Sequence, residues 1–237
     1  MPIATNPTNK ETAPGSSFKN ATRVQVSFVT VAEKRALAWF AAHMPAWVSS
    51  DQLTVLGFAG QIMVGVSYAL SRYDRQWLLW NILFLAVNWF GDSLDGTLAR
   101  FRNRQRPRYG FYLDHVIDAI GSTVLMVGLA LSGFMSPVVA LALLIAFLLL
   151  AIEVYLATYT IGSFHLSFFN LGPTEIRIIL AIGNIALYVR GPWAHLAGRT
   201  FLLFDLGAVA AIIGMMSMFL HAAVKHTVQL YREERLP

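Results

Sequence analysis

Six long apolar segments restrict what this chain can fold into. They lie at approximately residues 53–70, 77–91, 111–131, 138–161, 176–189 and 200–224. A bilayer core needs about 20 mostly apolar residues for each helical crossing. The second and fifth segments reach that length only by extending into their flanks, as from Asp92 to Ala99 after the second. The sequence therefore predicts an all-α integral membrane protein with six transmembrane helices.

Composition supports a membrane protein and excludes several kinds of site. Of the 237 residues, 56% are hydrophobic and 13% are charged, against roughly 45–50% and about 25% in soluble domains. The chain has no cysteine, which excludes disulfides, zinc–thiolate sites, iron–sulfur clusters and thiol nucleophiles. The net charge of +5 is assigned to the membrane surface rather than to nucleic acid.

The segments at the two ends differ from the apolar part. Residues 1–30 are polar and predict a flexible cytoplasmic tail, not a cleaved signal peptide. Residues 31–48 predict an interfacial amphipathic helix, because apolar side chains follow one face: Leu37, Phe40, Ala41, Met44 and Val48. The catalytic domain is expected over 49–225, and a cytoplasmic C-terminal tail over 226–237.

The basic residues predict the orientation of the spans. With six crossings, 14 of the 18 Lys and Arg residues fall on one side, including five in the connection 100–108, and four fall on the other. Basic residues favour the cytoplasmic side. Both termini are therefore predicted to be cytoplasmic.

Four aspartates fall at the ends of two neighbouring apolar segments. Asp92 and Asp95 share one helical face with Gly96 and Ala99, and Gly110, Asp114 and Asp118 share another. An Asp at the centre of a membrane helix costs roughly 2.5–3.5 kcal/mol, so such a cluster needs counter-charges. The short connection 100–109 predicts that these helices are antiparallel neighbours whose acidic faces meet. Four carboxylates of this kind suit hard divalent cations, Mg²⁺ or Mn²⁺, and two ions would balance their charge.

The acidic residues belong to a longer pattern, Asp92-x2-Asp95-Gly96-x2-Ala99-Arg100-x9-Gly110-x3-Asp114-x3-Asp118. It resembles the signature of the CDP-alcohol phosphotransferase (CDP-alcohol phosphatidyltransferase, class I) family of integral membrane enzymes. All eight signature positions hold the expected residue types, and the nine-residue spacer is one longer than the commonest form. The resemblance implies metal-dependent transfer of a phosphoalcohol group from a CDP-linked donor to a hydroxyl acceptor, with release of CMP.

The resemblance also implies roles for individual residues. Asp92, Asp95 and Asp114 would hold one ion, and Asp92, Asp114 and Asp118 would share a second. Asp118 would also be the catalytic base. The implied CDP-binding positions are Thr54, Gly96, Ala99, Arg100, Arg106 and Gly110. Candidates for the acceptor or its headgroup are Glu153, Glu175 and Arg177.

The substrates and two other functions stay open. The donor could be CDP-diacylglycerol, which the small size favours, or a CDP-aminoalcohol with diacylglycerol as acceptor. The stretch Gly172-Pro173-Thr174-Glu175, in which Thr174 could cap a helix, resembles the choline/ethanolamine branch and favours the second. A membrane prenyltransferase with Asp-rich diphosphate motifs is a more distant alternative, and a cation transporter is another. A homodimer is implied by the family resemblance alone.

Overall fold

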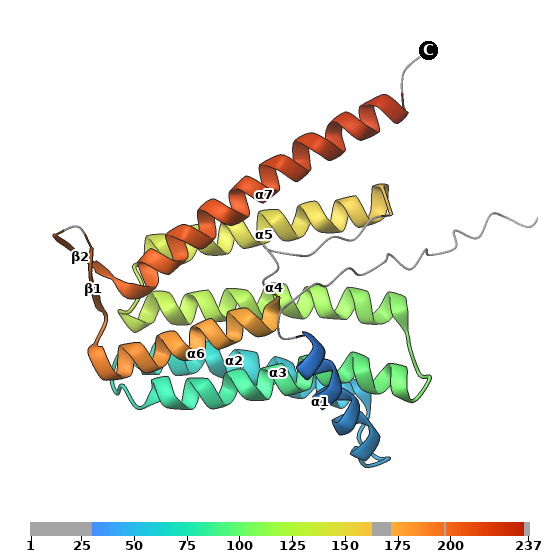
Figure 1. The fold of residues 1–237 in the computed structure, drawn as a ribbon, viewed down its shortest axis with the longest axis horizontal. Coiled ribbons are helices and arrows are strands. Elements are labelled where there is room, and N and C mark those ends of the chain that lie inside the picture. Colours follow the sequence, from blue (N-terminus) through green and yellow to red (C-terminus); the bar gives the residue numbers. More distant parts are fainter. Residues whose placement is uncertain (1–29, 163–171, 197, 235–237) are drawn as a thin grey trace, which may run out of the picture.

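The computed structural model describes residues 30–162, 172–196 and 198–234. Over these residues the chain forms helices and one short hairpin (Figure 1). In chain order they are α1 (Thr30–His43), α2 (Ser50–Leu70), α3 (Trp77–Phe101), α4 (Pro107–Ser132), α5 (Pro137–Thr160), α6 (Pro173–Arg190), β1 (Trp193–Leu196), β2 (Arg199–Leu202) and α7 (Leu203–Glu233). The tail predicted over residues 1–30 lies, except for Thr30, outside the described residues.

Local sequence signals explain where the helices begin and end. Ser49 caps α2 by accepting a bond from the Gln52 backbone N–H, and the Gln52 side chain accepts one from the Ser49 N–H. This is a capping box. Proline stands in the first turn of α4, α5 and α6, where its missing N–H is no loss. Gly133, with φ of 80°, ends α4.

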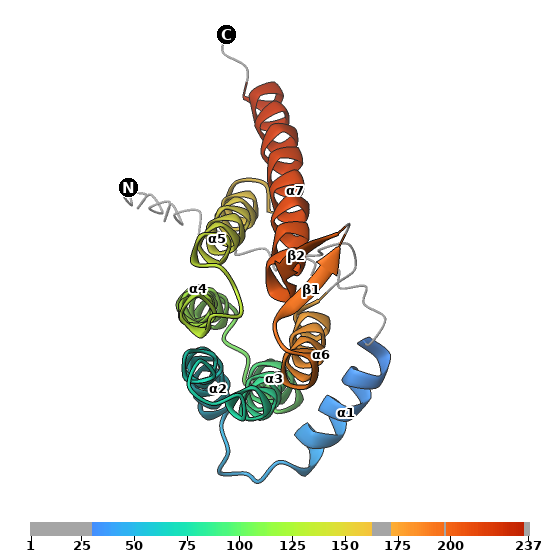
Figure 2. The ribbon, with the colours of Figure 1, turned by 90° about the vertical axis from the view of Figure 1, so that its left-hand side faces the viewer.

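The helices α3 and α4 are not the close neighbours that the sequence predicted. Instead, α2 packs closely against both of them, and α3 and α4 make at most slight contact with each other (Figure 2). Glycines allow this close packing of α2. A Cβ atom at Gly91 would lie 2.3 Å from the backbone N of Gly57, and one at Gly128 would lie 2.0 Å from the backbone O of Gly65. Pairs of small residues let membrane helices approach at their backbones.

Helices α5, α6 and α7 complete a ring with α2, α3 and α4 in Figure 2, and α1 lies outside it. α6 packs against α3, and α5 packs against both α4 and α7. A buried polar network joins α2, α3 and α6 within this ring. The Tyr68 hydroxyl donates to Asn184 Oδ1 at 2.9 Å, and Asn184 Nδ2 donates to Asn81 Oδ1 at 2.8 Å. Asn81 Nδ2 in turn donates to Ser67 Oγ at 2.7 Å.

The first helix is shorter than predicted and is packed against the bundle. α1 ends at His43, not at residue 48. Its apolar face lies against α3, where Leu37 and Ala41 are buried together with Leu94 and Leu98. The predicted apolar face is thus covered by protein, and the interfacial position of this helix stays a prediction.

Within the part of the chain that the structure describes, four helices are long and apolar enough to cross a membrane: α2, α4, α5 and α7. α3 is made more polar by its asparagines and aspartates, and the 18 residues of α6 include Glu175, Arg177 and Arg190. Crossings by α3 and α6 therefore stay predictions.

The last apolar segment begins later and continues farther than predicted. Residues 199–202 form β2, which pairs antiparallel with β1. Gly198, with φ of 75°, supplies the left-handed conformation that the connection between the strands needs. α7 then begins at Leu203 and continues to Glu233, well past residue 224 and into the predicted C-terminal tail.

Candidate active site

One small pocket gathers the four aspartates of the motif. Asp92 and Asp95 reach it from α3, and Asp114 and Asp118 reach it from α4. The wall between them comes from α2, so the helix that separates α3 from α4 also completes the site. The α2 residues that line it are Thr54, Gly57, Phe58 and Gln61.

Asp95 is held by α2. Only 9% of Asp95 is exposed, and its Oδ2 accepts a 2.6 Å bond from the Thr54 hydroxyl. The Gly96 backbone N–H donates to Oδ1. Ser50 Oγ also donates to the Asp95 backbone oxygen at 2.9 Å. The N-terminal end of α2 thus fixes both the side chain and the backbone of Asp95.

Asp92 is held by α6. Arg177 Nη2 lies 2.7 Å from Asp92 Oδ2, and Arg177 Nε donates to Asn88 Oδ1 at 2.7 Å. Asn88 Nδ2 donates to the Gly57 backbone oxygen at 2.9 Å. The third guanidinium nitrogen of Arg177, Nη1, is buried with no hydrogen-bond partner among the residues described. One arginine therefore links α6 to both Asp92 and Asn88.

The chemistry of this pocket suits a hard divalent cation, although its side chains are not gathered around one point. The lining offers only oxygen ligands of the carboxylate, amide and hydroxyl kinds, the set that Mg²⁺ and Mn²⁺ prefer. Among the described residues, no group of three or more acidic or histidine side chains is close enough to hold an ion. The metal-binding role of the four aspartates stays a prediction.

Of the expected donor-binding residues, Thr54 lines this pocket, whereas Gly96, Ala99 and Arg100 belong to the end of α3 and Gly110 to the start of α4. The Arg100 guanidinium lies next to Gly96, since a Cβ there would be 3.3 Å from Arg100 Nη1, and Arg100 Nη2 donates to Thr97 Oγ1 at 3.1 Å. A Cβ at Gly110 would meet nothing within 4 Å. Gly110 thus leaves open space at the helix surface, whereas the surface at Gly96 is covered by the Arg100 side chain. Ala99 belongs to the same last turns of α3.

Arg106 is engaged outside the pocket. It pairs with Asp51 in the first turn of α2, and its guanidinium carbon lies 4.2 Å from the centre of the Tyr109 ring. The hydrogen bond that Arg106 donates to the Asp51 carboxylate raises the pKa of Arg106 above its ordinary value. Its predicted contact with a donor stays a prediction.

Of the three acceptor candidates, Arg177 contacts the aspartate pocket directly, through its bonds to Asn88 and Asp92. Glu153 Oε1 lies 2.6 Å from His226 Nδ1 and joins α5 to α7. Glu175 Oε2 accepts a 2.9 Å bond from the Gly172 backbone N–H. The residue that caps α6 is Gly172, not Thr174 as predicted. Thr174 instead donates to Glu33 of α1 at 2.6 Å, because Pro173 begins the helix and places Thr174 inside its first turn.

Sequence reasoning named Thr54 and Arg177 as substrate-binding candidates, but it did not predict their bonds to Asp95 and Asp92 or the place of Gln61 in the pocket. Gln61 lines the pocket and packs against Gly121, where a Cβ would lie 2.2 Å from the Gln61 side chain. A glutamine inside an apolar segment was a visible signal. The link from Arg177 to Asp92 joins residues 85 positions apart, and no local pattern indicates it.

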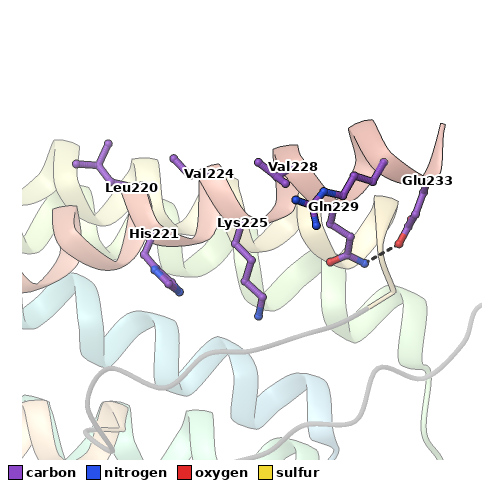
Figure 3. A pocket seen from close by; sticks show the side chains of 8 residues that line it. Leu220, His221, Val224, Lys225, Val228, Gln229 and Glu233 are labelled. Atoms are coloured by element: carbon purple, nitrogen blue, oxygen red, sulfur yellow. Dashed lines mark hydrogen bonds between the residues drawn. The ribbon is translucent and has the colours of Figure 1, made fainter. Parts of the chain in front are cut away.

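A second concave surface follows the C-terminal half of α7 (Figure 3). His221, Lys225 and Gln229 point to the same side of this helix in the figure, and Gln229 Nε2 donates to Glu233 at 2.9 Å. The lining contains one acidic residue, Glu233. The aspartate pocket is therefore the stronger candidate for the active site.

Comparison with known proteins agrees with the motif. The model of the CDP-alcohol phosphatidyltransferase family matches residues 47–223. Cholinephosphotransferase 1 of Saccharomyces cerevisiae is 30% identical over 167 residues, which cover 65% of this chain and 40% of that protein. Phosphatidylinositol phosphate synthase of Streptomyces avermitilis is 35% identical over 98 residues, covering 41% of this chain and 38% of that protein. Archaetidylinositol phosphate synthase of Methanothermobacter thermautotrophicus is 26% identical over 144 residues, 61% of this chain and 70% of that protein. The chain thus spans about two fifths of the length of the yeast and Streptomyces relatives.

Proposed function

Because this chain belongs to the CDP-alcohol phosphatidyltransferase family, a family of multi-pass membrane transferases, we propose that it transfers a phosphoalcohol group from a CDP-linked donor to a hydroxyl acceptor and releases CMP. One observation carries the proposal. The four aspartates of the family motif line a single pocket, although they come from two helices that hardly touch. A prenyltransferase or a cation transporter has no comparable support.

The residues of the pocket have distinct proposed tasks. Thr54 orients Asp95 through its 2.6 Å bond. Gly110 leaves room for the donor against α4, and Arg100, whose side chain covers Gly96, binds its phosphates, since a guanidinium matches phosphate oxygens. We propose that Asp118 accepts the proton of the acceptor hydroxyl as its oxygen attacks the β-phosphorus. The bond from that phosphorus to the bridging oxygen breaks, and CMP departs.

The proposed metal ligands are the same four carboxylates. Asp92, Asp95 and Asp114 would hold one divalent cation, and Asp92, Asp114 and Asp118 would hold a second. Mg²⁺ or Mn²⁺ bound there would offset the negative charge of the pyrophosphate and of the groups that develop during transfer. Calorimetric titration with Mn²⁺ in detergent tests this assignment, which predicts two sites per chain.

Arg177 is the proposed residue for an anionic group of the acceptor. It forms an ion pair with a pocket aspartate, and its Nη1 is buried without a partner among the described residues. A phosphate or carboxylate oxygen beside it would satisfy that N–H group. Glu175 and Glu153 stay weaker proposals, because their observed bonds are to the α6 cap and to His226.

Two substrate pairs are to be compared. Transfer from CDP-diacylglycerol to a phosphate-bearing or amino-acid alcohol is the first proposal, supported by the phosphatidylinositol phosphate synthase match. Transfer from CDP-choline or CDP-ethanolamine to diacylglycerol is the second. It is supported by the yeast cholinephosphotransferase match, which covers more of this chain.

The decisive experiment measures CMP. Purified protein is incubated with CDP-diacylglycerol and glycerol phosphate, inositol phosphate or serine, and separately with CDP-choline or CDP-ethanolamine and diacylglycerol. Acceptor-dependent release of CMP in one arm identifies the pair. Absence of CMP in every arm, from protein that still binds CDP, would refute the proposed reaction. The cytoplasmic position of both termini and of the site is proposed from the distribution of basic residues, and the homodimer from the family alone.

A further inference from the structure

Glu33 joins three helices through one oxygen atom. Its Oε1 accepts a 2.8 Å bond from Trp89 Nε1 of α3 and a 2.6 Å bond from the Thr174 hydroxyl of α6. Glu33 itself lies near the start of α1 and is partly buried. Since a carboxylate oxygen has two lone pairs, this geometry uses one acceptor atom to set the spacing of α3 and α6.

The two donors lie next to the residues that hold Asp92. Trp89 follows Asn88 and comes three residues before Asp92 on α3. Thr174 is in the first turn of α6, and Arg177 lies three residues later, close to one helical turn away. Arg177 bonds to both Asn88 and Asp92. Glu33 and Arg177 therefore connect the same stretches of α3 and α6, about one turn apart.

The rest of α1 is fixed to α3, so Glu33 is not on a loose segment. Leu37 and Ala41 are buried against Leu94 and Leu98. At the other end, Arg102 directly follows α3 and donates to the backbone oxygens of three residues just after α1: Met44, Pro45 and Val48. α1 thus spans the part of α3 that carries Asp92 and Asp95, and it contacts α3 on both sides of that part.

We propose that Glu33 is a positioning residue, which holds the first turn of α6 against α3 and thereby keeps Arg177 on Asp92. The effect of Glu33 on turnover rests on the proposed function, whereas its effect on the placement of α6 does not. α1 then lies across α3 and reaches α6, and Glu33 is the side chain through which it acts on α6.

Kinetic comparison of four variants tests the role. Glu33→Ala removes both accepted bonds and should lower kcat/KM for CMP release by about tenfold, the equivalent of one or two lost hydrogen bonds. Glu33→Gln keeps an amide oxygen as acceptor and should stay close to wild type. Thr174→Val removes only the bond to α6 and should resemble Glu33→Ala. Lys34→Ala, at an exposed neighbour on α1, is the matched control and should match wild type.

A double variant separates positioning from a general loss of stability. If Glu33 acts through Arg177, Glu33→Ala combined with Arg177→Ala should be no slower than Arg177→Ala alone. Independent effects would multiply, and that result would overturn the proposal.

A distance measurement decides the placement of α6 without any reaction. The chain has no cysteine, so the substitutions Arg35→Cys and Ile178→Cys provide the only two thiols for spin labels. Both positions are exposed. The distance distribution between α1 and α6 should broaden with Glu33→Ala and with Thr174→Val, and should stay narrow with Glu33→Gln. An unchanged distribution in the first two variants would overturn the proposal, whatever substrates the enzyme takes.

Discussion

Replacing Gly91 by alanine should separate the two helices that frame the active site. The added Cβ would lie 2.3 Å from the backbone N, 2.5 Å from Cα of Gly57 and 2.6 Å from the Leu53 backbone oxygen. Ordinary contacts of a Cβ atom begin at 3.4 Å. All three neighbours are backbone atoms that no side-chain rotation can move. α2 and α3 must therefore separate by about 1 Å, roughly the missing contact distance.

The consequence for the site follows from that displacement. The bond from Thr54 to Asp95 spans the same two helices and measures 2.6 Å. A further 1 Å would lengthen it to about 3.6 Å, beyond hydrogen-bond distance. Forced overpacking costs roughly 1–3 kcal/mol, and the lost bond adds about 1 kcal/mol. We expect a total near 3 kcal/mol, a melting temperature in detergent lower by on the order of 5–10 °C, and a marked loss of CMP release.

A matched substitution controls for the change from glycine to alanine. Gly207 lies within α7, and a Cβ there would meet nothing within 4 Å. Gly207→Ala should leave the melting temperature unchanged or raise it, because alanine favours helix by up to about 1 kcal/mol. If Gly91→Ala had the same melting temperature as Gly207→Ala, the close packing of α2 on α3 would be wrong.

Three further substitutions test other parts of the structure. Thr54→Val removes the hydroxyl that orients Asp95 and should lower kcat/KM about tenfold. Thr54→Ser keeps a hydroxyl and should have kcat/KM close to wild type. Equal activity of the two variants would contradict the orienting role of Thr54. Asp118→Asn should reduce turnover by roughly 10²–10⁴-fold while CDP binding survives, so near-normal turnover would refute the assignment of the base. Tyr68→Phe leaves Asn184 Oδ1 without the 2.9 Å bond that it accepts from Tyr68 and should destabilise the fold by about 1–3 kcal/mol, measured by thermal unfolding, with no change in the KM for the donor.

Sequence patterns predicted the helices better than their packing. The apolar segments found by sequence overlap α2, α3, α4, α5, α6 and α7, because length and hydrophobicity are local properties of each segment. Which helices pack against each other depends instead on which glycines come into contact. Gly57 and Gly91 form a contact only after two helices dock, and hydrophobic periodicity does not show which faces will pair.

Sequence analysis named the four aspartates of the candidate site, but it did not predict which side chains bond to them. Spacing alone placed Asp92 with Asp95 and Asp114 with Asp118, because each pair is local to one helix. Arg177 and Glu33 act across 85 and 141 residues of sequence. Such bonds form only when helices that are far apart in the sequence pack together. Local sequence patterns do not show which helices will do so.

The polar character of α3 explains why so many helices surround it. Unpartnered polar groups are costly in an apolar interior, and α3 carries two asparagines and two aspartates that therefore need partners: Asn81, Asn88, Asp92 and Asp95. Each has a partner on α2, on α6 or on both: Asn81 and Asn88 on α2 and α6, Asp92 on α6, and Asp95 on α2. The acids that the proposed chemistry requires would therefore be unstable in α3 alone. Any substitution on α2 or α6 that removes one of these partners should change the active site even where it touches no substrate.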